Sequence, residues 1–511
     1  MHSVPAIRIR QANGQTINAR GDYVLYWMIA NRRVNWNFAL DRAVDHAREL
    51  KKPLVILEAL RVGYPWASDR LHRFVLQGMA DNQQALARRP VLYYPYVEPK
   101  QGAGHGLLER LADDACLVVT DEFPCFFLPR MVNAAAGRLK VRCEVVDSCG
   151  LLPLRAAEND FPTAYAFRRF LQRVLPEHLP HVPRADPFAG VKLPAPHQLA
   201  ASMTRNWPKA SADLLAAKEA ALRQLPIDHA VGPASQDGGG VAAERLTSHF
   251  LRKLLADYPE RRNEPAAHAT SGLSPYLHFG HVSSHEVFHR LAEQEAWLAE
   301  SLPGLATGKR PGWWGMSDAA EAFLDQLITW RELGYNFCTF REDYDRYDSL
   351  PDWAKKTLAK HRRDRRRTIY SDMEFETART HDRLWNAAQR QLVVEGQMHN
   401  YVRMLWGKKI LEWSETPEEA LATMVKLNNK YALDGRDPNS YSGIFWILGR
   451  FDRAWGPERP IFGTVRYMSS DNTARKFDVK PYLEKYAPER DTEESDGTAR
   501  TTHVHRLSKR K

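Results

Sequence analysis

Short apolar runs alternate with amphipathic stretches through residues 22–150. The runs YVLYWMIA, PLVILEAL, VLYYPYV and ACLVVT have the length and composition of buried strands, and KVRCEVVDS is a further candidate. Between the first two lies VNWNFALDRAVDHAREL, whose apolar residues recur with helical spacing. Strands separated by helices are typical of a parallel sheet covered on both faces. Residues 1–185 are therefore predicted to form an α/β domain.

Beyond residue 240 the apolar pattern becomes helical. Apolar residues recur at i, i+3, i+4 and i+7 in AAERLTSHFLRKLLADY, DAAEAFLDQLITWRELGYNF and PEEALATMVKLNNKYAL, which predicts an all-α domain over residues 241–486. The proline-rich and glycine-rich stretch 186–240 predicts a linker with one helix in its middle. The polar, charged stretch 487–511 has no period and predicts a disordered tail.

Composition agrees with a division into domains, because 511 residues exceed one ordinary core. The chain has 72 Lys and Arg against 62 Asp and Glu, and this charge of +10 favours a polyanionic partner. No apolar run is long enough to span a bilayer, and MHSVPAIRIRQANG does not resemble a secretion signal. The five cysteines form no CxxC pair. We therefore expect a cytoplasmic protein with reduced thiols and no membrane association.

One short motif matches a zinc-peptidase pattern. His285, Glu286 and His289 spell HEVFH on a predicted helix, where two histidines four residues apart could share a metal ion. The alternative is a helix with surface histidines, which His278 and His281 just upstream favour. Since the sequence shows no third ligand in the expected setting, no metal site is predicted.

Hydroxyl side chains surround a glycine directly before a predicted helix. Thr270, Ser271 and Ser274 flank Gly272 in HATSGLSPYLHF. Such a turn can present hydroxyl and backbone N–H groups to an anion, and the helix N-terminus strengthens the attraction. Helix capping by Ser or Thr explains the same residues, so both possibilities stay open.

Other residues also have a structural and a functional explanation. Arg403 and Asp434 lie in apolar surroundings, either as a buried pair lining a polar cofactor or as a surface ion pair. Trp406 and Trp413 are seven residues apart and share one helix face, with Trp385 one helix upstream. These tryptophans fit either a core or an electron relay to a buried redox cofactor.

Six segments together carry a family resemblance: DYPERRNEP, LSPYLHFGHVS, THDRLWNAAQ, MHNYVRMLWGKKILEW, LDGRDPNSYSGIFW and RPIFGTVRYM. In order, spacing and residue type they resemble the photolyase/cryptochrome flavoproteins, most closely the class II cyclobutane pyrimidine dimer photolyases. The resemblance implies an α/β, Rossmann-like antenna domain followed by an all-α C-terminal FAD-binding domain. It implies FAD as cofactor, with a reduced deazaflavin or a folate as an optional antenna chromophore.

The resemblance also implies site residues, position by position. Arg403 and Asp434 would pair beside the isoalloxazine ring, and Asn428 would face its N5 atom and stabilise the reduced ring. The tryptophans that match the electron-transfer positions of the family are Trp385, Trp406 and Trp413. The residues implied to bind FAD are Tyr258, Thr270, Ser271, Gly272, Leu273, Ser274, Arg331, Arg403, Asn428, Asp434 and Asp437.

For the substrate, the resemblance implies a pocket that takes a pyrimidine dimer flipped out of UV-damaged DNA. Trp330, Met404 and Trp446 match the residues that hold the flipped dimer. Arg466 would contact phosphates, and so would the basic run KHRRDRRR at residues 360–367, which by itself fits a solvated loop equally well.

One position departs from the family pattern. Where the family has a glutamate that hydrogen-bonds the dimer, this chain has Gln326, with Asp325 beside it. Glutamine can donate a hydrogen bond but cannot deliver a proton. The leading hypothesis is a monomeric, blue-light-driven DNA photolyase of class II type that splits dimers by electron transfer from reduced FAD. The alternative is a cryptochrome-like photoreceptor, which Gln326 and the charged tail favour.

Overall fold

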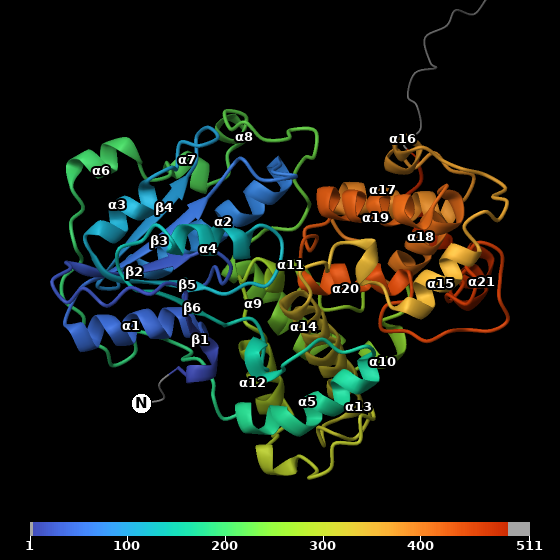
Figure 1. Cartoon of the computed structure of the whole chain (residues 1–511), viewed down its shortest axis with the longest axis horizontal. Coiled ribbons are helices and arrows are strands. Elements are labelled where there is room, and N and C mark those ends of the chain that lie inside the picture. Colours follow the sequence, from blue (N-terminus) through green and yellow to red (C-terminus); the bar gives the residue numbers. More distant parts are fainter. Residues whose placement is uncertain (1–3, 489–511) are drawn as a thin grey trace, which may run out of the picture.

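The computed structural model describes residues 4–488, and its N-terminal part is built on a six-stranded sheet (Figure 1). The sheet order is β1-β6-β5-β2-β3-β4, with β2 to β6 parallel and β1 antiparallel to β6. The strands are β1 (Ile9–Gln11), β2 (Tyr23–Met28), β3 (Leu54–Leu60), β4 (Val91–Val97), β5 (Ala115–Asp121) and β6 (Cys143–Val146). The predicted strands are confirmed. The short edge strand β1 was not predicted, because its three residues are too few to show a period.

Helices cover both faces of this sheet. Alternate side chains of each strand point to opposite faces, and because these side chains are apolar on both faces, both need a covering layer. Val24 and Tyr26 of β2 pack with α1 (Phe38–Leu50), which lies below the sheet in Figure 1. The opposite face, with Leu25 and Trp27, is covered by α2 (Asp69–Leu86), α3 (Leu107–Asp113) and α4 (Leu128–Ala136). The α/β fold class is thus confirmed.

Residues 186–240 connect the two parts of the chain and pack on the first. The prediction of one helix was wrong, since the structure has three short ones, α6 (Ala201–Asn206), α7 (Ala212–Leu215) and α8 (Glu219–Leu222). Leu215 and Leu222 join Leu60 of the sheet and Met79 of α2 in one apolar cluster. Each of these helices is too short to show a helical period in the sequence.

The second half of the described chain is helical, as predicted, and after β6 the described residues contain no further strand. No helix within residues 4–488 is both long and apolar enough to cross a membrane. The disordered tail predicted for 487–511 lies, from residue 489 onward, outside the described residues. The helices of this half are α9 (Gly240–His249), α10 (Tyr258–Arg261), α11 (Ser274–His278), α12 (Ser284–Gln294), α13 (Asp318–Leu324), α14 (Arg331–Phe340), α15 (Asp352–Lys360), α16 (Asp372–Glu376), α17 (Arg383–Glu395), α18 (Asn400–Trp413), α19 (Pro417–Tyr431), α20 (Pro438–Ile447), α21 (Ser470–Lys476) and α22 (Lys480–Lys485).

A wider turn interrupts the helix that contains the WREL motif. The π-helical turn Asp325–Trp330 joins α13 directly to α14. Such turns insert one residue into an α-helix and are frequent at functional sites. The helix α5 (Ala164–His178), which precedes the linker, packs against this turn, and its Arg168 pairs with Asp325 at 3.0 Å. The turn is therefore held from a distant part of the chain.

Buried charged groups join the two domains at the start of α14. Glu332 accepts hydrogen bonds from the backbone N–H groups of Leu151 and Leu152 at 2.7 and 3.0 Å. Arg331 donates to the carbonyl of Cys149 at 2.8 Å. Burial raises the pKa of Glu332 to about 7, against the lowering effect of Arg331 and the two N–H groups. Groups buried this deeply must keep their partners, so these bonds fix α14 to the sheet domain.

The variant Glu332→Gln tests this junction. Its amide keeps one acceptor oxygen and turns an NH2 group toward the second N–H, so the free energy of unfolding should fall by about 2–3 kcal/mol. Because the folded pKa of about 7 exceeds the unfolded value of about 4.3, the folded state holds the proton between these values, and stability falls as pH rises through that window.

Urea unfolding from about pH 4.5 to 8 measures both effects. Glutamine does not titrate in this range, so the variant should lack this part of the pH slope. Glu300→Gln, at an exposed glutamate, is the matched control and should unfold like wild type. Equal stabilities of wild type and Glu332→Gln across the range would contradict the role given to the carboxyl group.

Candidate functional site

The hydroxyl-rich turn before α11 leads to a buried carboxylate. Gly272 has a φ of 66°, a left-handed conformation that glycine adopts without strain. Ser271 Oγ accepts a hydrogen bond from the backbone N–H of Leu273 at 3.4 Å. Leu273 is the N-cap residue of α11, while Ser274 donates its hydroxyl to Asp434 at 2.7 Å. Helix capping therefore does not explain Ser274.

Asp434 is the centre of a small polar network. It accepts hydrogen bonds from Ser274 Oγ at 2.7 Å and from Arg403 Nη2 at 3.3 Å. Burial opposes its ionisation, but Arg403 and the Ser274 hydroxyl outweigh burial and hold the pKa of Asp434 below its usual value. Among the described residues, Arg403 Nε is buried without a hydrogen-bond partner. The pair is thus not a surface ion pair, and it keeps a buried donor that a ligand can use.

Two helix ends bring further polar groups to the same region. Asn428 near the end of α19 is buried and donates through Nδ2 to Ser440 Oγ at 2.7 Å. Asp437 precedes α20, and its Oδ2 lies 3.3 Å from both His278 Nδ1 and the Tyr335 hydroxyl. These contacts join α11, α14, α19 and α20.

Tyr258 is buried in an aromatic corner. Its ring meets Phe250 and Phe323 edge-on, with centroids 5.5 and 5.7 Å apart. Burial raises the pKa of Tyr258, against the lowering effect of Arg262, so the phenol is neutral at physiological pH. Thr270, the first residue of the predicted anion turn, is exposed and makes no hydrogen bond within residues 4–488.

The two tryptophans predicted to hold a lesion stack on each other. The ring centroids of Trp330 and Trp446 are 4.5 Å apart and their planes differ by 14°. Trp330 donates its indole N–H to Asp325 at 3.1 Å. Met404 is half-buried and packs against the same hydrophobic core. Gln326 is half-buried, and its side-chain amide makes no hydrogen bond to any described residue, so this amide can bond to a ligand.

The three predicted relay tryptophans are buried close together. Trp385 donates its indole N–H to the carbonyl of Trp406 at 2.9 Å, and its ring centroid lies 5.9 Å from that of Trp413. The ring of Trp413 in turn lies 5.5 Å from Tyr370 and 5.1 Å from the exposed His381. Contacts between aromatic residues thus lead from the helical core to the surface.

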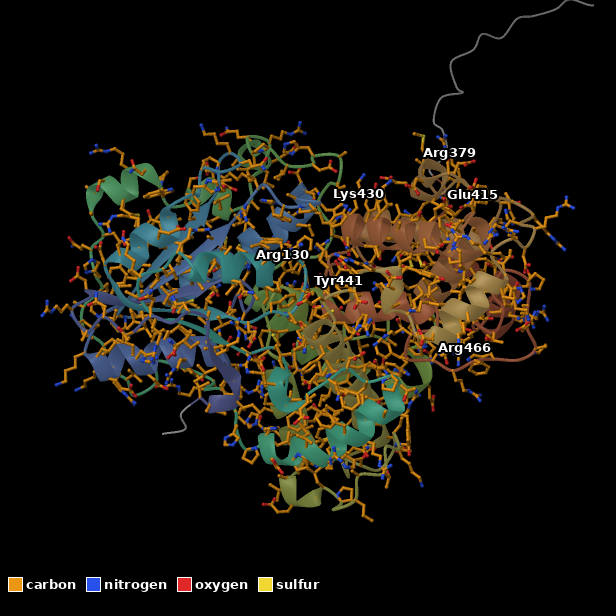
Figure 2. The ribbon with its side chains drawn as sticks, in the orientation of Figure 1. Arg130, Arg379, Glu415, Lys430, Tyr441 and Arg466 are labelled. Carbon is orange, nitrogen blue, oxygen red and sulfur yellow. The ribbon has the colours of Figure 1, made fainter. Side chains whose placement is uncertain are left out.

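Figure 2 places Arg466 on the helical part of the molecule, below α15 in that view. Its guanidinium carbon lies 4.2 Å from the ring centre of Trp455, and its Nε lies 3.6 Å from Asp452. The basic run 360–367 is largely exposed. Arg362 pairs with Glu418, and Lys360 and His361 both lie against Glu458.

A cavity of about 580 Å³ lies at the carboxyl ends of the parallel strands. Strands β2 and β5 are neighbours in the sheet but not in the sequence, and such switch points bind ligands in α/β sheets. His278 lines the cavity and also contacts Asp437, so the cavity adjoins the polar site. Its aromatic walls include Trp27, Tyr64, Phe123 and Phe126, and its cations are Arg32, Arg61, Arg138 and Arg436.

The HEVFH helix contributes to the domain junction. The prediction of surface histidines was wrong for His285, which is buried with its Nε2 3.1 Å from the carbonyl oxygen of Gly150. His289 lies over Trp36, with ring centroids 5.2 Å apart. No group of three His, Cys, Asp or Glu side chains in the described chain could hold a metal ion.

Some residues of the site had no signal in the sequence. Nothing in the sequence distinguishes Ser440 and Tyr335 from other helix residues. Their roles follow only from the packing of α14, α19 and α20. Tyr335 accepts a hydrogen bond from Arg331 Nη2 at 2.9 Å and connects it to Asp437. The guanidinium of Arg331 thus serves the domain junction and the Tyr335–Asp437 contact, and its predicted contact with a cofactor stays a prediction.

No family model matches the chain. The deoxyribodipyrimidine photo-lyase of Methanothermobacter thermautotrophicus is 35% identical over 485 residues, which cover 94% of this chain and 98% of the relative. A bacterial class III photolyase from Agrobacterium tumefaciens has a similar structure, with a TM-score of 0.65 and 17% identity over 91% of this chain and 86% of that chain. An archaeal photolyase from Sulfolobus tokodaii, solved with two FAD molecules, gives a TM-score of 0.62 and 14% identity over 91% and 90%.

Proposed function

The chain belongs to the deoxyribodipyrimidine photo-lyase family, and we propose that it is a FAD-dependent enzyme of class II type that splits cyclobutane pyrimidine dimers in UV-damaged DNA under blue light. The observation that carries the proposal is the Ser274–Asp434–Arg403 network, which keeps a buried donor in the same helical domain as the tryptophan path. We further propose a monomer acting in the cytoplasm. The five cysteines, all buried and free of disulfide bonds, support a reducing compartment.

The residues present fit FAD. The Thr270–Ser274 turn offers hydroxyl groups and a left-handed glycine, which suit a diphosphate. Arg403 offers a buried N–H without a protein partner, and Tyr258 offers a neutral aromatic wall. Donors to phosphate and an apolar ring pocket are the chemistry that a flavin dinucleotide requires.

When bound and reduced, FAD supplies under blue light the electron that opens the cyclobutane ring, and it receives that electron back. Asp434 is ionised because its pKa is lowered, and it holds the guanidinium of Arg403, which would then lie beside the ring system of bound FAD. Asn428, held by Ser440, would present its amide to N5. The surrounding apolar side chains exclude water, which strengthens these polar contacts.

Trp330, Trp446 and Met404 would receive the dimer. The two indole rings contact each other, and a flipped pyrimidine pair would exchange this ring contact for contacts with its bases. Arg466 and the exposed run 360–367 would bind phosphates without reading the base sequence.

We also propose that the cavity beside β2 and β5 holds the antenna chromophore, a reduced deazaflavin or a folate. Its aromatic walls suit a planar ring system, and its four arginines suit an acidic tail. His278 lines this cavity and contacts Asp437, one of the residues expected to bind FAD. This contact supports a short distance between the antenna chromophore and FAD.

Gln326 favours the second candidate function, a cryptochrome-like photoreceptor. Its amide has no described partner and cannot deliver a proton to a dimer. The stacked pair Trp330–Trp446 favours repair, because a photoreceptor has no need of a surface that stacks nucleobases.

The purified, photoreduced protein should remove dimers from a damaged oligonucleotide under blue light and not in the dark. Chromatography of the oligonucleotide after illumination measures the loss. If the protein binds and photoreduces FAD but leaves the dimer intact, the repair function is wrong and the photoreceptor function takes its place. Loss of dimers in the dark would exclude both.

We propose the relay order Trp406–Trp385–Trp413, which the contacts of Trp385 support. Trp385→Phe removes the middle indole of the relay and should slow flavin photoreduction by about tenfold or more. A tenfold change corresponds to about 1.4 kcal/mol of added barrier. Repair by chemically reduced enzyme should persist. Trp313→Phe is the matched control, because Trp313 is buried with an unpaired indole N–H outside the relay. Photoreduction at the wild-type rate in Trp385→Phe would exclude this path.

Gln326→Glu should raise the repair rate about fivefold, because a protonated carboxyl group, unlike an amide, can deliver a proton to the developing radical anion, which we take to lower the barrier by about 1 kcal/mol. The gain should be larger at low pH, since only the protonated carboxyl group donates. Gln326→Leu, which removes the hydrogen bond, should lower the rate. Single-turnover repair measures all three enzymes, and equal rates would show that this side chain does not touch the lesion.

A further inference from the structure

A cluster of charged groups lies beside the stacked tryptophans. Arg168 Nε and Nη2 both lie 3.0 Å from Asp325 Oδ1. Asp325 Oδ2 accepts from Trp330 Nε1 at 3.1 Å, while Arg310 Nε lies at 3.7 Å, beyond hydrogen-bond length. The carboxylate is therefore already bonded on both oxygens, and Arg310 adds only a weak attraction.

The π-helical turn creates this arrangement. In a regular α-helix, residues five apart lie about 140° apart around the axis, because each residue advances by about 100°. Asp325 and Trp330 would then face different sides, whereas the wider turn lets the carboxylate reach the indole N–H. The turn thus fixes the Trp330 ring beside Trp446.

Arg310 is held above this ring with its charge exposed. Its guanidinium carbon lies 5.9 Å from the ring centre of Trp330, and 58% of its side chain is exposed. The preceding residues are fixed to α5, because Gln172 accepts from the Gly308 N–H at 2.6 Å and donates to the Lys309 carbonyl at 2.9 Å. The cation is therefore presented from an ordered backbone.

The charges around Arg310 leave an excess of one cation. Two guanidinium groups, of Arg168 and Arg310, lie against the single carboxylate of Asp325. Glu321 of α13 is bonded instead to the backbone N–H groups of Gly312, Trp314 and Gly315. Lys309 and Arg310 are exposed, whereas Arg168 and Asp325 are buried. An exposed, positively charged arginine beside a base-stacking surface suits a nucleic-acid phosphate.

We propose that Arg310 binds a backbone phosphate of the damaged strand next to the flipped dimer, and that the contacts of Gln172 with Gly308 and Lys309 position it there. This inference rests on the proposed function, which places the dimer against Trp330 and Trp446. Because the arginine lies beside this pair, the phosphate contact forms fully only when the nucleotides are flipped. Arg310 therefore contributes to the preference for damaged over intact DNA.

The test is the dissociation constant of the flavin-loaded enzyme for a dimer-containing duplex in the dark, measured by fluorescence anisotropy at several salt concentrations. Arg310→Gln should weaken binding about 5- to 10-fold near 0.1 M salt and lower the log–log salt slope by about 0.9, the contribution of one phosphate contact. The weakening should be smaller for the intact duplex. Arg310→Lys should keep the slope, because it keeps the charge.

Arg89→Gln is the matched control. Arg89 also combines an ion pair, with Asp186 at 2.8 Å, and a ring contact, with Phe188 at 5.6 Å, but it lies in the α/β domain. It should bind DNA like wild type. An unchanged salt slope in Arg310→Gln would overturn the inference, whether or not affinity falls. Absence of any preference for damaged DNA in wild type would instead overturn the proposed function.

Discussion

The position of the functional site depends on the charged groups buried where α14 meets the sheet domain. Glu332 binds two backbone N–H groups of the loop after β6, and the neighbouring Arg331 binds a carbonyl of the same loop. The same loop is bound by a third charged residue, since the buried Arg8 pairs with Asp147 and donates to the carbonyl of Leu151. Charges this deep are costly unless every partner is present, so the two domains have one favourable relative position.

This junction determines where the functional site lies, because residues on both sides of it along the same helix belong to the site. Before it, the π-helical turn carries Trp330 toward Trp446. One turn after Arg331, Tyr335 reaches Asp437 and so contacts the segment that leads into α20. The same helix therefore aligns the surface proposed to hold the lesion with the polar groups proposed to hold FAD.

The helical core has a second use as an electron path. Trp385, Trp406 and Trp413 are as buried as any core residues, and their packing would stabilise the fold in any case. What distinguishes them is that their contacts continue to Tyr370 and the exposed His381. Burial and electron transfer require the same close aromatic contacts, so a single set of side chains can serve both.

The sequence by itself determined the elements and the classes of residue. Short apolar runs and helical periods are local patterns, so they identified the strands of the sheet and the long helices. Family motifs singled out Arg403, Asp434 and Trp330. The three-residue strand β1 and the three short linker helices were not predicted from the sequence, because they are too short to show a period.

Tertiary structure alone decided which of these residues meet. Ser274 bonds to Asp434 across 160 positions. The π-helical turn couples Trp330 to Asp325, while the side-chain amide of Gln326 has no hydrogen-bond partner among the described residues. Such contacts depend on how the helices pack and on which buried groups need partners, and neither is encoded in a local pattern.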